Sequence, residues 1–143
     1  MSDSEYIPST WDMAANHVER YLASDGDDGY EFHGAECVVL TTRGRRTGAI
    51  RRSPLIRVRD GDRYLAVASM GGAPSHPSWY LNLVADPNVT IQDRGEVHEM
   101  VARTADPDEK VELWPRVVTQ WPDYEAYQER TERDIPVVVC KPR

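Results

Sequence analysis

The segment from Thr41 to Arg59 reads TTRGRRTGAIRRSPLIRVR and concentrates positive charge in an otherwise acidic chain. Seven of the 17 lysine and arginine residues lie in it, and no acidic residue occurs between Cys37 and Val58. Arginine presents a planar fork of donors that matches phosphate or carboxylate groups, and glycine lets backbone N–H groups turn toward a bound anion. The segment therefore predicts a binding site for an anionic molecule.

The residues around these arginines have the pattern of a β-hairpin. Cys37 to Leu40 is a short apolar run rich in β-branched residues, and Ile50 to Val58 has the pattern of a second strand. The loop from Arg43 to Gly48 carries three arginines and two glycines. Because Pro54 lacks a backbone donor, we expect the second strand at a sheet edge or a bulge.

The composition limits the class of protein. A chain of 143 residues suits one domain, and a net charge of -7 with a pI near 5.0 argues against general affinity for nucleic acid. One basic segment fits a small anionic ligand better. The two cysteines, Cys37 and Cys140, lie in apolar runs, so we expect buried thiols in a reducing cytoplasm and no disulfide framework.

Hydrophobic periodicity and turn residues divide the rest of the chain. We expect a helix from Trp11 to Ala23, capped by Ser9 or Thr10, after a mobile segment at residues 1–9. A turn at residues 60–62 predicts that the next strand runs antiparallel to the one ending at Val58. The remaining predictions are strands at 63–68, 89–92, 96–102 and 135–140, and helices that begin near Pro77, at Asp106 and at Tyr124, the last running to about Arg133.

About six short strands in hairpins, with a few helices, predict a single mainly β domain over residues 10–143. The pattern favours a mostly antiparallel barrel, closed or partly open. The chain lacks the strand and helix alternation of a dinucleotide-binding fold. It also lacks a G-x-G-x-x-G motif and a Walker phosphate loop.

Individual reactive residues give weaker signals. Ser69 ends a predicted strand beside two glycines, where a hydroxyl can bond a ligand carbonyl. Trp121, Tyr124 and Tyr127 suit either core packing or a wall against a flat ring. No metal site is predicted, because metal-ligand spacing is missing for His17, His33, His76 and His98.

Three separated segments carry a family resemblance. They read VLTTRGRRTGAIRRSPL, VASMGGAPSHPSWYLNLVADPNV and WPDYEAYQERTERDIPVVVC. Together they resemble the deazaflavin-dependent nitroreductase family of actinobacteria, over about Cys37 to Pro142 and in unbroken order. The resemblance implies a split β-barrel similar to that of FMN-binding reductases. It also implies coenzyme F420, an 8-hydroxy-5-deazaflavin with a phosphate and an oligoglutamate tail, whose negative charge agrees with the predicted anion site.

Carried over by position, the resemblance implies the cofactor contacts. Arg45, Arg46 and Arg51 would hold the phosphate and the tail carboxylates through charge-assisted hydrogen bonds. Backbone groups around residues 54–56 and 68–70 would hold the ring system. The full set of implied cofactor contacts is Arg45, Arg46, Thr47, Arg51, Arg52, Ser53, Pro54, Leu55, Ile56, Val67, Ala68, Ser69, Met70, Ser78, Trp79, Tyr80, Leu81 and Asn82.

The resemblance also implies a substrate side with an aromatic lip of Trp121, Tyr124 and Tyr127. Tyr124 is the expected proton donor or orienting hydroxyl, and Ser69 is the second polar contact. The implied reaction is hydride transfer from reduced F420 to a small electrophilic acceptor: a quinone, an activated enone or a nitroaromatic. Arg46 stands where a lysine is common in the family, and Trp121 stands where a tyrosine occurs in a well-known member.

Other functions stay open at this point. An FMN-dependent split-barrel oxidoreductase would have the same fold, but FMN has one phosphate and no glutamate tail, so the arginine excess favours the deazaflavin. A non-catalytic carrier of F420 would bind the coenzyme without turnover. A nucleic-acid-binding barrel would need aromatic side chains among the arginines, and the hairpin contains none.

The N-terminal helix has two interpretations. Its apolar residues suit packing on the domain, but Trp and Tyr on one face also suit contact with a membrane or a second subunit. No run of residues approaches the roughly 20 apolar positions of a membrane span, and no signal peptide is visible. We therefore expect a cytoplasmic protein, with peripheral membrane association through this helix as the alternative.

Overall fold

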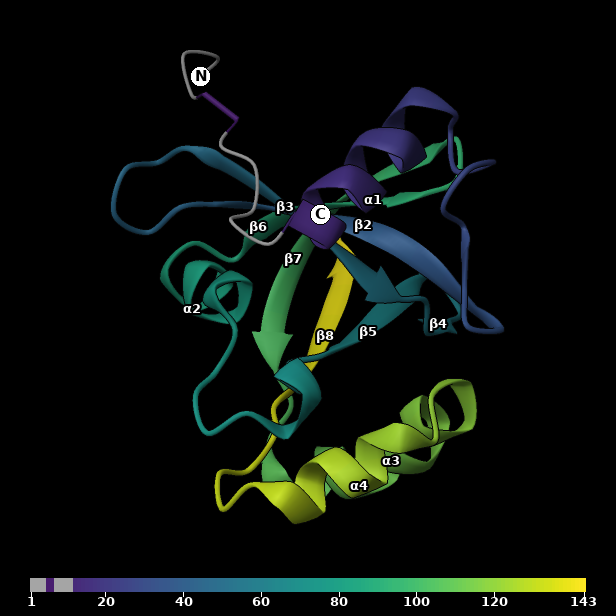
Figure 1. Cartoon of the computed structure of the whole chain (residues 1–143). Helices are drawn as coiled ribbons and strands as arrows, with labels where there is room; N and C mark the ends of the chain where they lie inside the picture. The colour runs from purple at the N-terminus through teal and green to yellow at the C-terminus, as the bar shows by residue number, and fades with distance from the viewer. Residues whose placement is uncertain (1–4, 7–11) are drawn as a thin grey trace.

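The computed structural model describes residues 5–6 and 12–143. A strongly curled β-sheet with helices on its outside forms a half-barrel (Figure 1). Its strands are β1 (Glu31–Phe32), β2 (Ala35–Arg43), β3 (Ile50–Ile56), β4 (Arg59–Asp60), β5 (Arg63–Val67), β6 (Asn88–Asp93), β7 (Glu96–Thr104) and β8 (Val137–Pro142). The helices are α1 (Asp12–Ala23), the short 3-10 helix η1 (Met70–Gly72), α2 (Ser78–Ala85), α3 (Pro107–Gln120) and α4 (Asp123–Arg130).

The strand order along the sheet is β1-β2-β6-β7-β8-β5-β4, with β3 paired to β2, and every ladder is antiparallel. This confirms the predicted mainly β, split-barrel fold. The sheet has eight strands where about six were predicted. The difference comes from β1 and β4, which have two residues each and are too short to show an alternating pattern.

The predicted N-terminal helix is present as α1 from Asp12 onward. Its expected cap, Ser9 or Thr10, and Trp11 lie outside the described residues, as does most of the predicted mobile segment 1–9. The predicted start of α3 is confirmed, because the Asp106 carboxylate accepts a hydrogen bond from the Glu109 N–H at 2.8 Å. In the described part of the chain, no helix combines the length and the apolar character that crossing a membrane requires.

Buried side chains fix the helices against the sheet. Leu83 of α2 lies in one cluster with Met100 of β7, and Val117 of α3 lies in a second cluster with residues of β5 and β8. Val18 of α1 lies in a third cluster with Val39 of β2. Each such aliphatic side chain stabilises the fold by about 1.5–3 kcal/mol when it is fully buried. This packing fixes the positions of α1, α2 and α3 relative to the sheet.

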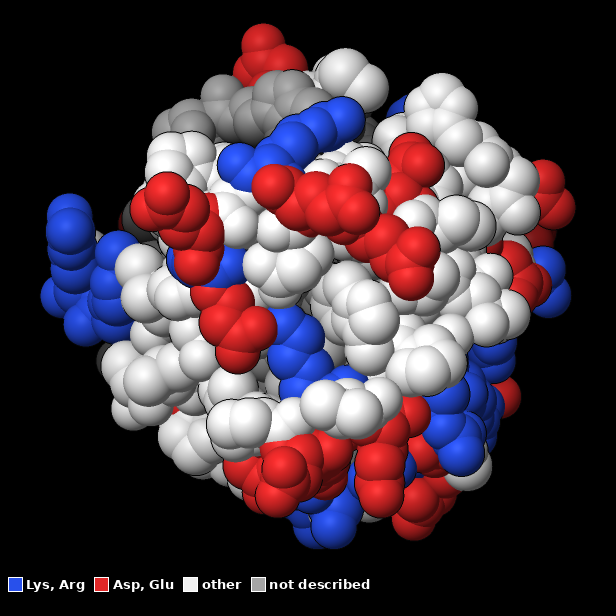
Figure 2. All heavy atoms as spheres, turned by 90° about the horizontal axis from the view of Figure 1, so that it is seen from below, with Lys and Arg blue, Asp and Glu red and all other residues white. Residues whose placement is uncertain are grey.

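The outward side of α3 and α4 is strongly charged. Figure 2 views this side of the molecule and shows acidic side chains gathered beside basic ones. Four acidic residues of these helices are exposed: Asp108 and Glu112 of α3, and Glu125 and Glu129 of α4. The net acidity of the chain is thus carried in part by a surface different from the arginine-rich hairpin.

The predicted end of the strand that begins at Ile50 is wrong, because it was placed at Val58. β3 stops at Ile56, and the chain bends before β4 begins. The predicted antiparallel turn at residues 60–62 is confirmed, because β5 pairs with β4 and the Leu65 N–H donates to the Val58 carbonyl at 2.9 Å. β5 does not continue along β3, and its other neighbour is β8. The bend has a physical cause: the Arg57 Nε donates to the Asp93 carboxylate at 2.8 Å, and Val58 enters the core cluster under α3. The predicted last helix also ends earlier, at Arg130.

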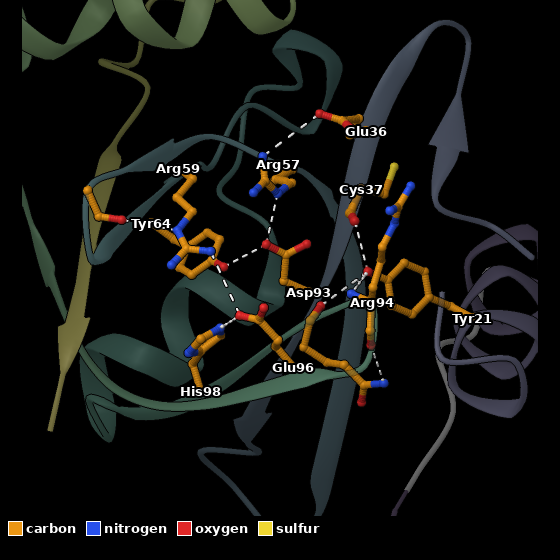
Figure 3. Close-up of polar contacts among 12 residues, drawn as sticks. Tyr21, Glu36, Cys37, Arg57, Arg59, Tyr64, Asp93, Arg94, Glu96 and His98 are labelled. Atoms are coloured by element: carbon orange, nitrogen blue, oxygen red, sulfur yellow. Dashed lines mark hydrogen bonds and ion pairs between the residues drawn. The ribbon is translucent and has the colours of Figure 1, made fainter. Parts of the chain in front are cut away.

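A buried polar network holds this bend (Figure 3). The Asp93 carboxylate, which is 7% exposed, accepts hydrogen bonds from Arg57 and, at 2.6 Å, from the Tyr64 hydroxyl. The Tyr21 hydroxyl donates to a backbone carbonyl of β2 at 3.0 Å and accepts from the Arg94 N–H at 2.7 Å. Burial raises the pKa of Tyr21 to about 12, so this hydroxyl is neutral near pH 7. The network ties α1, β2, β5 and β6 together.

Candidate functional site

A cavity of about 710 Å³ lies between the β2–β3 hairpin, the loop after β5, the start of α2 and helix α4. Its volume is within the range of about 300–1,000 Å³ that is typical of small-molecule sites. Residues from all three predicted motifs meet there. The predicted site residues that line the cavity are Arg45, Arg46, Thr47, Arg51, Arg52, Ser53, Pro54, Leu55, Ile56, Val67, Ser69, Met70, Ser78, Trp79, Asn82, Trp121, Tyr124 and Tyr127.

Three residues carried over as cofactor contacts lie outside this lining: Ala68, Tyr80 and Leu81. Ala68 is fully buried in the protein. The positions of Tyr80 and Leu81 outside the lining follow from helix geometry. Residues 78, 79 and 82 of α2 share the side toward the cavity, and the two residues between them point away from it. The Tyr80 hydroxyl instead pairs with the Thr104 hydroxyl at 2.8 Å. The side chains of these three residues therefore do not line the cavity, and their predicted contacts with the cofactor, which for Ala68 are backbone contacts, stay predictions.

The basic end of the cavity is built on Asn82 of α2. This side chain is 4% exposed, and its Oδ1 accepts from the Arg45 N–H at 3.1 Å and from the Arg45 guanidinium at 3.0 Å. Its Nδ2 donates to the Thr42 hydroxyl at 3.3 Å. Asn82 thereby orients the loop, while Arg45 and Arg46 stay exposed. Both guanidinium groups keep donors available for an anion, since each has five N–H groups.

Strand β3 forms the wall next to these arginines. All seven of its residues are partly exposed, and residues 51–56 all line the cavity. Its ladder is with β2; among the described residues, the other backbone bridge on β3 is one to Tyr6. An edge strand offers unpaired backbone N–H and C=O groups to a ligand. This edge position also confirms the prediction made from Pro54, because an edge strand tolerates the loss of a donor.

The opposite wall is aromatic. The Trp121 Nε1 donates to the Tyr127 hydroxyl at 3.3 Å, and the Trp121 ring stacks on Phe32 with 6.1 Å between centroids. Tyr124 packs edge-on to Tyr127 at 6.2 Å and is 5% exposed. Burial raises the pKa of the Tyr124 hydroxyl well above its ordinary value, so the group keeps its proton near neutral pH. A flat ring bound here would meet apolar surface and one neutral O–H donor.

The cavity also has eight lining residues that sequence reasoning missed. Four of them lie on α1 and β1 and reach the site only through the fold, whereas the other four lie in segments that the sequence pattern had already singled out for other reasons. Cys37 is among them, and its burial raises its pKa to about 11, so it contributes a neutral thiol, as a small apolar group. The eight are Met13, Ala14, His17, Phe32, Cys37, Gly44, Gly71 and Pro77.

Arg133 is a ninth residue that the sequence did not single out. It does not line the cavity, but its guanidinium donates to the carbonyls of Ala68, Ser69 and Ala73. These three residues belong to the loop after β5, which forms part of the cavity wall. No local pattern could have identified these contacts, because they join positions 60 or more residues apart.

The sequence of the chain is similar to those of known proteins. A family model described as F420H(2)-dependent quinone reductase matches residues 13–142. The F420H(2)-dependent quinone reductase Rv1261c of Mycobacterium tuberculosis (strain ATCC 25618 / H37Rv) is 38% identical over 131 residues, which are 89% of this chain and 88% of that protein.

Solved structures agree with this match. One described as an F420-H2 dependent reductase (FDR-A) has a TM-score of 0.69 and 40% identity, and the match covers 73% of this chain and 93% of that one. Another, described as a domain-swapped dimer, has a TM-score of 0.72 and 37% identity, and covers 93% of this chain and all of that one (100%). The family resemblance seen in the sequence is thereby confirmed, and the chain belongs to the F420H(2)-dependent quinone reductase family.

Proposed function

We propose that this chain is an oxidoreductase that transfers a hydride from F420H2 to a quinone bound against the aromatic wall of the cavity. The observation that carries the proposal is that one cavity joins an arginine-rich edge strand to a buried neutral tyrosine. Membership of the quinone reductase family gives the same cofactor and the same class of enzyme. The expected cofactor, F420, and the expected hydride transfer are therefore supported by two independent lines.

The donor set of the cavity fits the chemistry of the coenzyme. F420 carries a phosphate and several carboxylates, and Arg45, Arg46 and Arg51 all line the cavity. Guanidinium groups bind such oxyanions through paired, charge-assisted hydrogen bonds. β3, whose ladder within the described part of the chain is with β2, would offer backbone groups to the polar rim of a flat ring. When bound, F420H2 supplies the hydride.

The protein's own part in the reaction is positioning and proton supply. A quinone that accepts a hydride also needs one proton to become a hydroquinone. We assign that proton to the Tyr124 hydroxyl, which is neutral and lines the cavity. Solvent would have to return the proton to this hydroxyl after turnover. Ser69 is the second polar group in reach of the same space and would orient the acceptor oxygen. Trp121 and Tyr127 would stack on the acceptor and exclude water.

The direct test is an absorbance assay of F420H2 oxidation by a soluble quinone such as menadione, next to a binding titration with F420 and with FMN. We expect tight F420 binding, weak FMN binding and rapid oxidation only with enzyme present. Tighter binding of FMN would assign the chain to FMN chemistry. Binding of F420 without accelerated oxidation of any quinone would make it a carrier.

Activated enones and nitroaromatics remain predicted acceptors, which the same assay can test. Contact of α1 with a membrane is also a prediction. α1 offers the exposed Met13 at the cavity, and a vesicle flotation assay with anionic lipid would measure the association.

A further inference from the structure

The loop after β5 holds one residue, Met70, in a conformation that a non-glycine residue does not favour. Met70, Gly71 and Gly72 have consecutive positive φ angles of 46°, 64° and 83°. A non-glycine residue in this left-handed region costs roughly 1–2 kcal/mol, so Met70 stays there only if other contacts hold it. Ser69, Met70 and Gly71 line the cavity, and any change in the loop therefore moves the wall that faces a bound ring.

One guanidinium spans both ends of this loop. Arg133 donates through Nε to the Ala73 carbonyl at 2.8 Å, through Nη1 to the Ala68 carbonyl at 3.0 Å and through Nη2 to the Ser69 carbonyl at 2.7 Å. Its Nη1 also lies 2.9 Å from the His76 Nδ1. The planar fork of arginine spreads its donors over three nitrogens and so spans both ends of the loop, whereas the three donors of an ammonium group share one nitrogen. We call these contacts the Arg133 bridge.

The other end of the Arg133 bridge is attached to the aromatic wall. Gln128 of α4 donates through Nε2 to the Arg133 carbonyl at 2.8 Å, and its Oε1 accepts from the Ile135 N–H at 2.9 Å. α4 is the helix that carries Tyr124 and Tyr127. The backbone of Tyr127 also packs closely on Gly72. The loop with Ser69 and the helix with Tyr124 are therefore parts of one hydrogen-bonded unit.

We propose that Arg133 is a positioning residue for hydride transfer: by bridging the 68–73 loop and α4, it fixes where the acceptor sits relative to the cofactor ring. The inference rests on the proposed function. Arg133 does not line the cavity, so it acts through Ser69 and Tyr124 and not by touching the reactants. Hydride transfer is sensitive to such placement, because a shift of about 1 Å can cost on the order of 100-fold in rate.

The test compares Arg133→Gln and Arg133→Lys with Arg116→Gln, a matched loss of an arginine. The Arg116 side chain is 59% exposed and pairs with Asp60 of β4, and neither residue lines the cavity. We expect both Arg133 variants to lower kcat at least about tenfold with KM for the quinone changed less than about threefold. The lysine variant should not rescue, because the charge is kept and the fork is lost. Arg116→Gln should retain the activity of the wild type.

Hydrogen exchange of the unliganded protein provides a readout that needs no turnover. We expect faster amide exchange at residues 69–73 in both Arg133 variants, with the β-sheet protected as in the wild type. Full activity in either Arg133 variant, or unchanged exchange in this loop, would overturn the inference. If Arg133→Gln does not fold, Arg133→Lys decides. If the wild type itself oxidises no F420H2, the proposed function fails, whereas the exchange data still decide whether the bridge orders the loop.

Discussion

The two walls of the cavity are built in opposite ways. The hairpin wall, residues 43–56, is one continuous segment whose shape comes from seven ladder pairs with the neighbouring strand. The lip wall combines residues 67–73 with residues 121–133, which are about 50 residues away in the chain and are joined by side-chain contacts. The hairpin wall supplies charge from a local sequence pattern. The lip wall supplies apolar surface and a proton donor from long-range packing.

This difference separates binding from chemistry. Changes at Arg45 and Arg46 of the hairpin wall should alter affinity for an anionic cofactor and leave the catalytic step intact, since these two arginines are exposed. Changes in the lip wall should alter turnover or stability, because its groups are buried and mutually dependent. Four substitutions test this separation, in order of decreasing expected effect.

The largest effect is expected for Tyr124→Phe in the lip wall. Loss of a proton donor typically lowers kcat by about 10²–10⁴-fold, and we expect this range with F420 affinity nearly unchanged. The raised pKa of Tyr124 also predicts that wild-type kcat shows no loss from its ionisation between about pH 6 and pH 9. Stopped-flow absorbance of F420H2 oxidation measures both.

Tyr127→Phe is the control for this change, because it removes only the acceptor of the Trp121 N–H. We expect less than about a tenfold change in kcat from losing that neutral hydrogen bond. Equal activity of Tyr124→Phe and wild type would mean that Tyr124 is not the donor.

A smaller effect, on stability, is expected for Gly72→Ala. A Cβ there would lie 2.7 Å from the Tyr127 carbonyl oxygen, at a φ of +83°. The clash and the left-handed backbone together should cost about 2–4 kcal/mol in urea unfolding. Gly71→Ala has a φ of +64° with no atom within 4 Å, so it should cost only the backbone part, roughly 1–2 kcal/mol.

Gly48→Ala provides the same comparison in the hairpin wall. Its φ is +75° and its Cβ position is also open, so it should match Gly71→Ala. A cost for Gly72→Ala no larger than that of these two variants would show that α4 is free to move away from the loop.

Next in size is Arg45→Ala in the hairpin wall. We expect it to weaken binding of the coenzyme with a long glutamate tail by about 1.5–3 kcal/mol more than binding of a tail-less precursor, as for one lost charged hydrogen bond. kcat at saturating coenzyme should stay within about threefold of the wild type. Fluorescence titration measures the two affinities. Equal weakening of both ligands would place Arg45 away from the tail.

The smallest effect is a pH dependence at the edge of the lip wall. Burial, together with the charge of Arg133, lowers the pKa of His76 from 6.5, so the unfolded chain binds this proton more readily than the folded protein. Stability from this group is complete above the unfolded pKa and is lost as the pH falls below it. Between about pH 7 and pH 5, Tm of the wild type should fall more than Tm of His76→Gln. Parallel curves would show that the pKa of His76 is the same in the folded and the unfolded chain.

The hairpin wall was predictable because its signals are local. Arginine spacing, paired glycines and β-branched runs each report on neighbours along the chain, and the structure places the resulting strand at an edge as Pro54 indicated. The end of that strand was not predictable. The bend after Ile56 depends on Asp93, whose sequence neighbours give no sign that it meets Arg57 inside the protein.

The site residues show the same contrast between features that a local sequence pattern predicts and features that depend on long-range contacts. The sequence motif did not show which residues of α2 line the cavity. The helix decides this, because it points Tyr80 and Leu81 away from the cavity. Phe32 and Met13 joined the cavity from elements whose apolar residues could equally have entered the core. Arg133 stood in a motif as one charged residue among several, and its three carbonyl partners became visible only when the loop and α4 were folded together.

The sequence by itself determined the class of fold, the family and the anionic nature of the ligand, since these depend on periodicity and on a contiguous cluster of charge. Tertiary structure alone decided which aromatic side chains meet the arginine strand, how deeply Tyr124 is buried and which guanidinium braces the loop. The physical reason is the separation along the chain. Hydrogen bonds and burial between residues 50 or more positions apart depend on how the sheet curls, and the residues next to each of them in sequence do not specify that curvature.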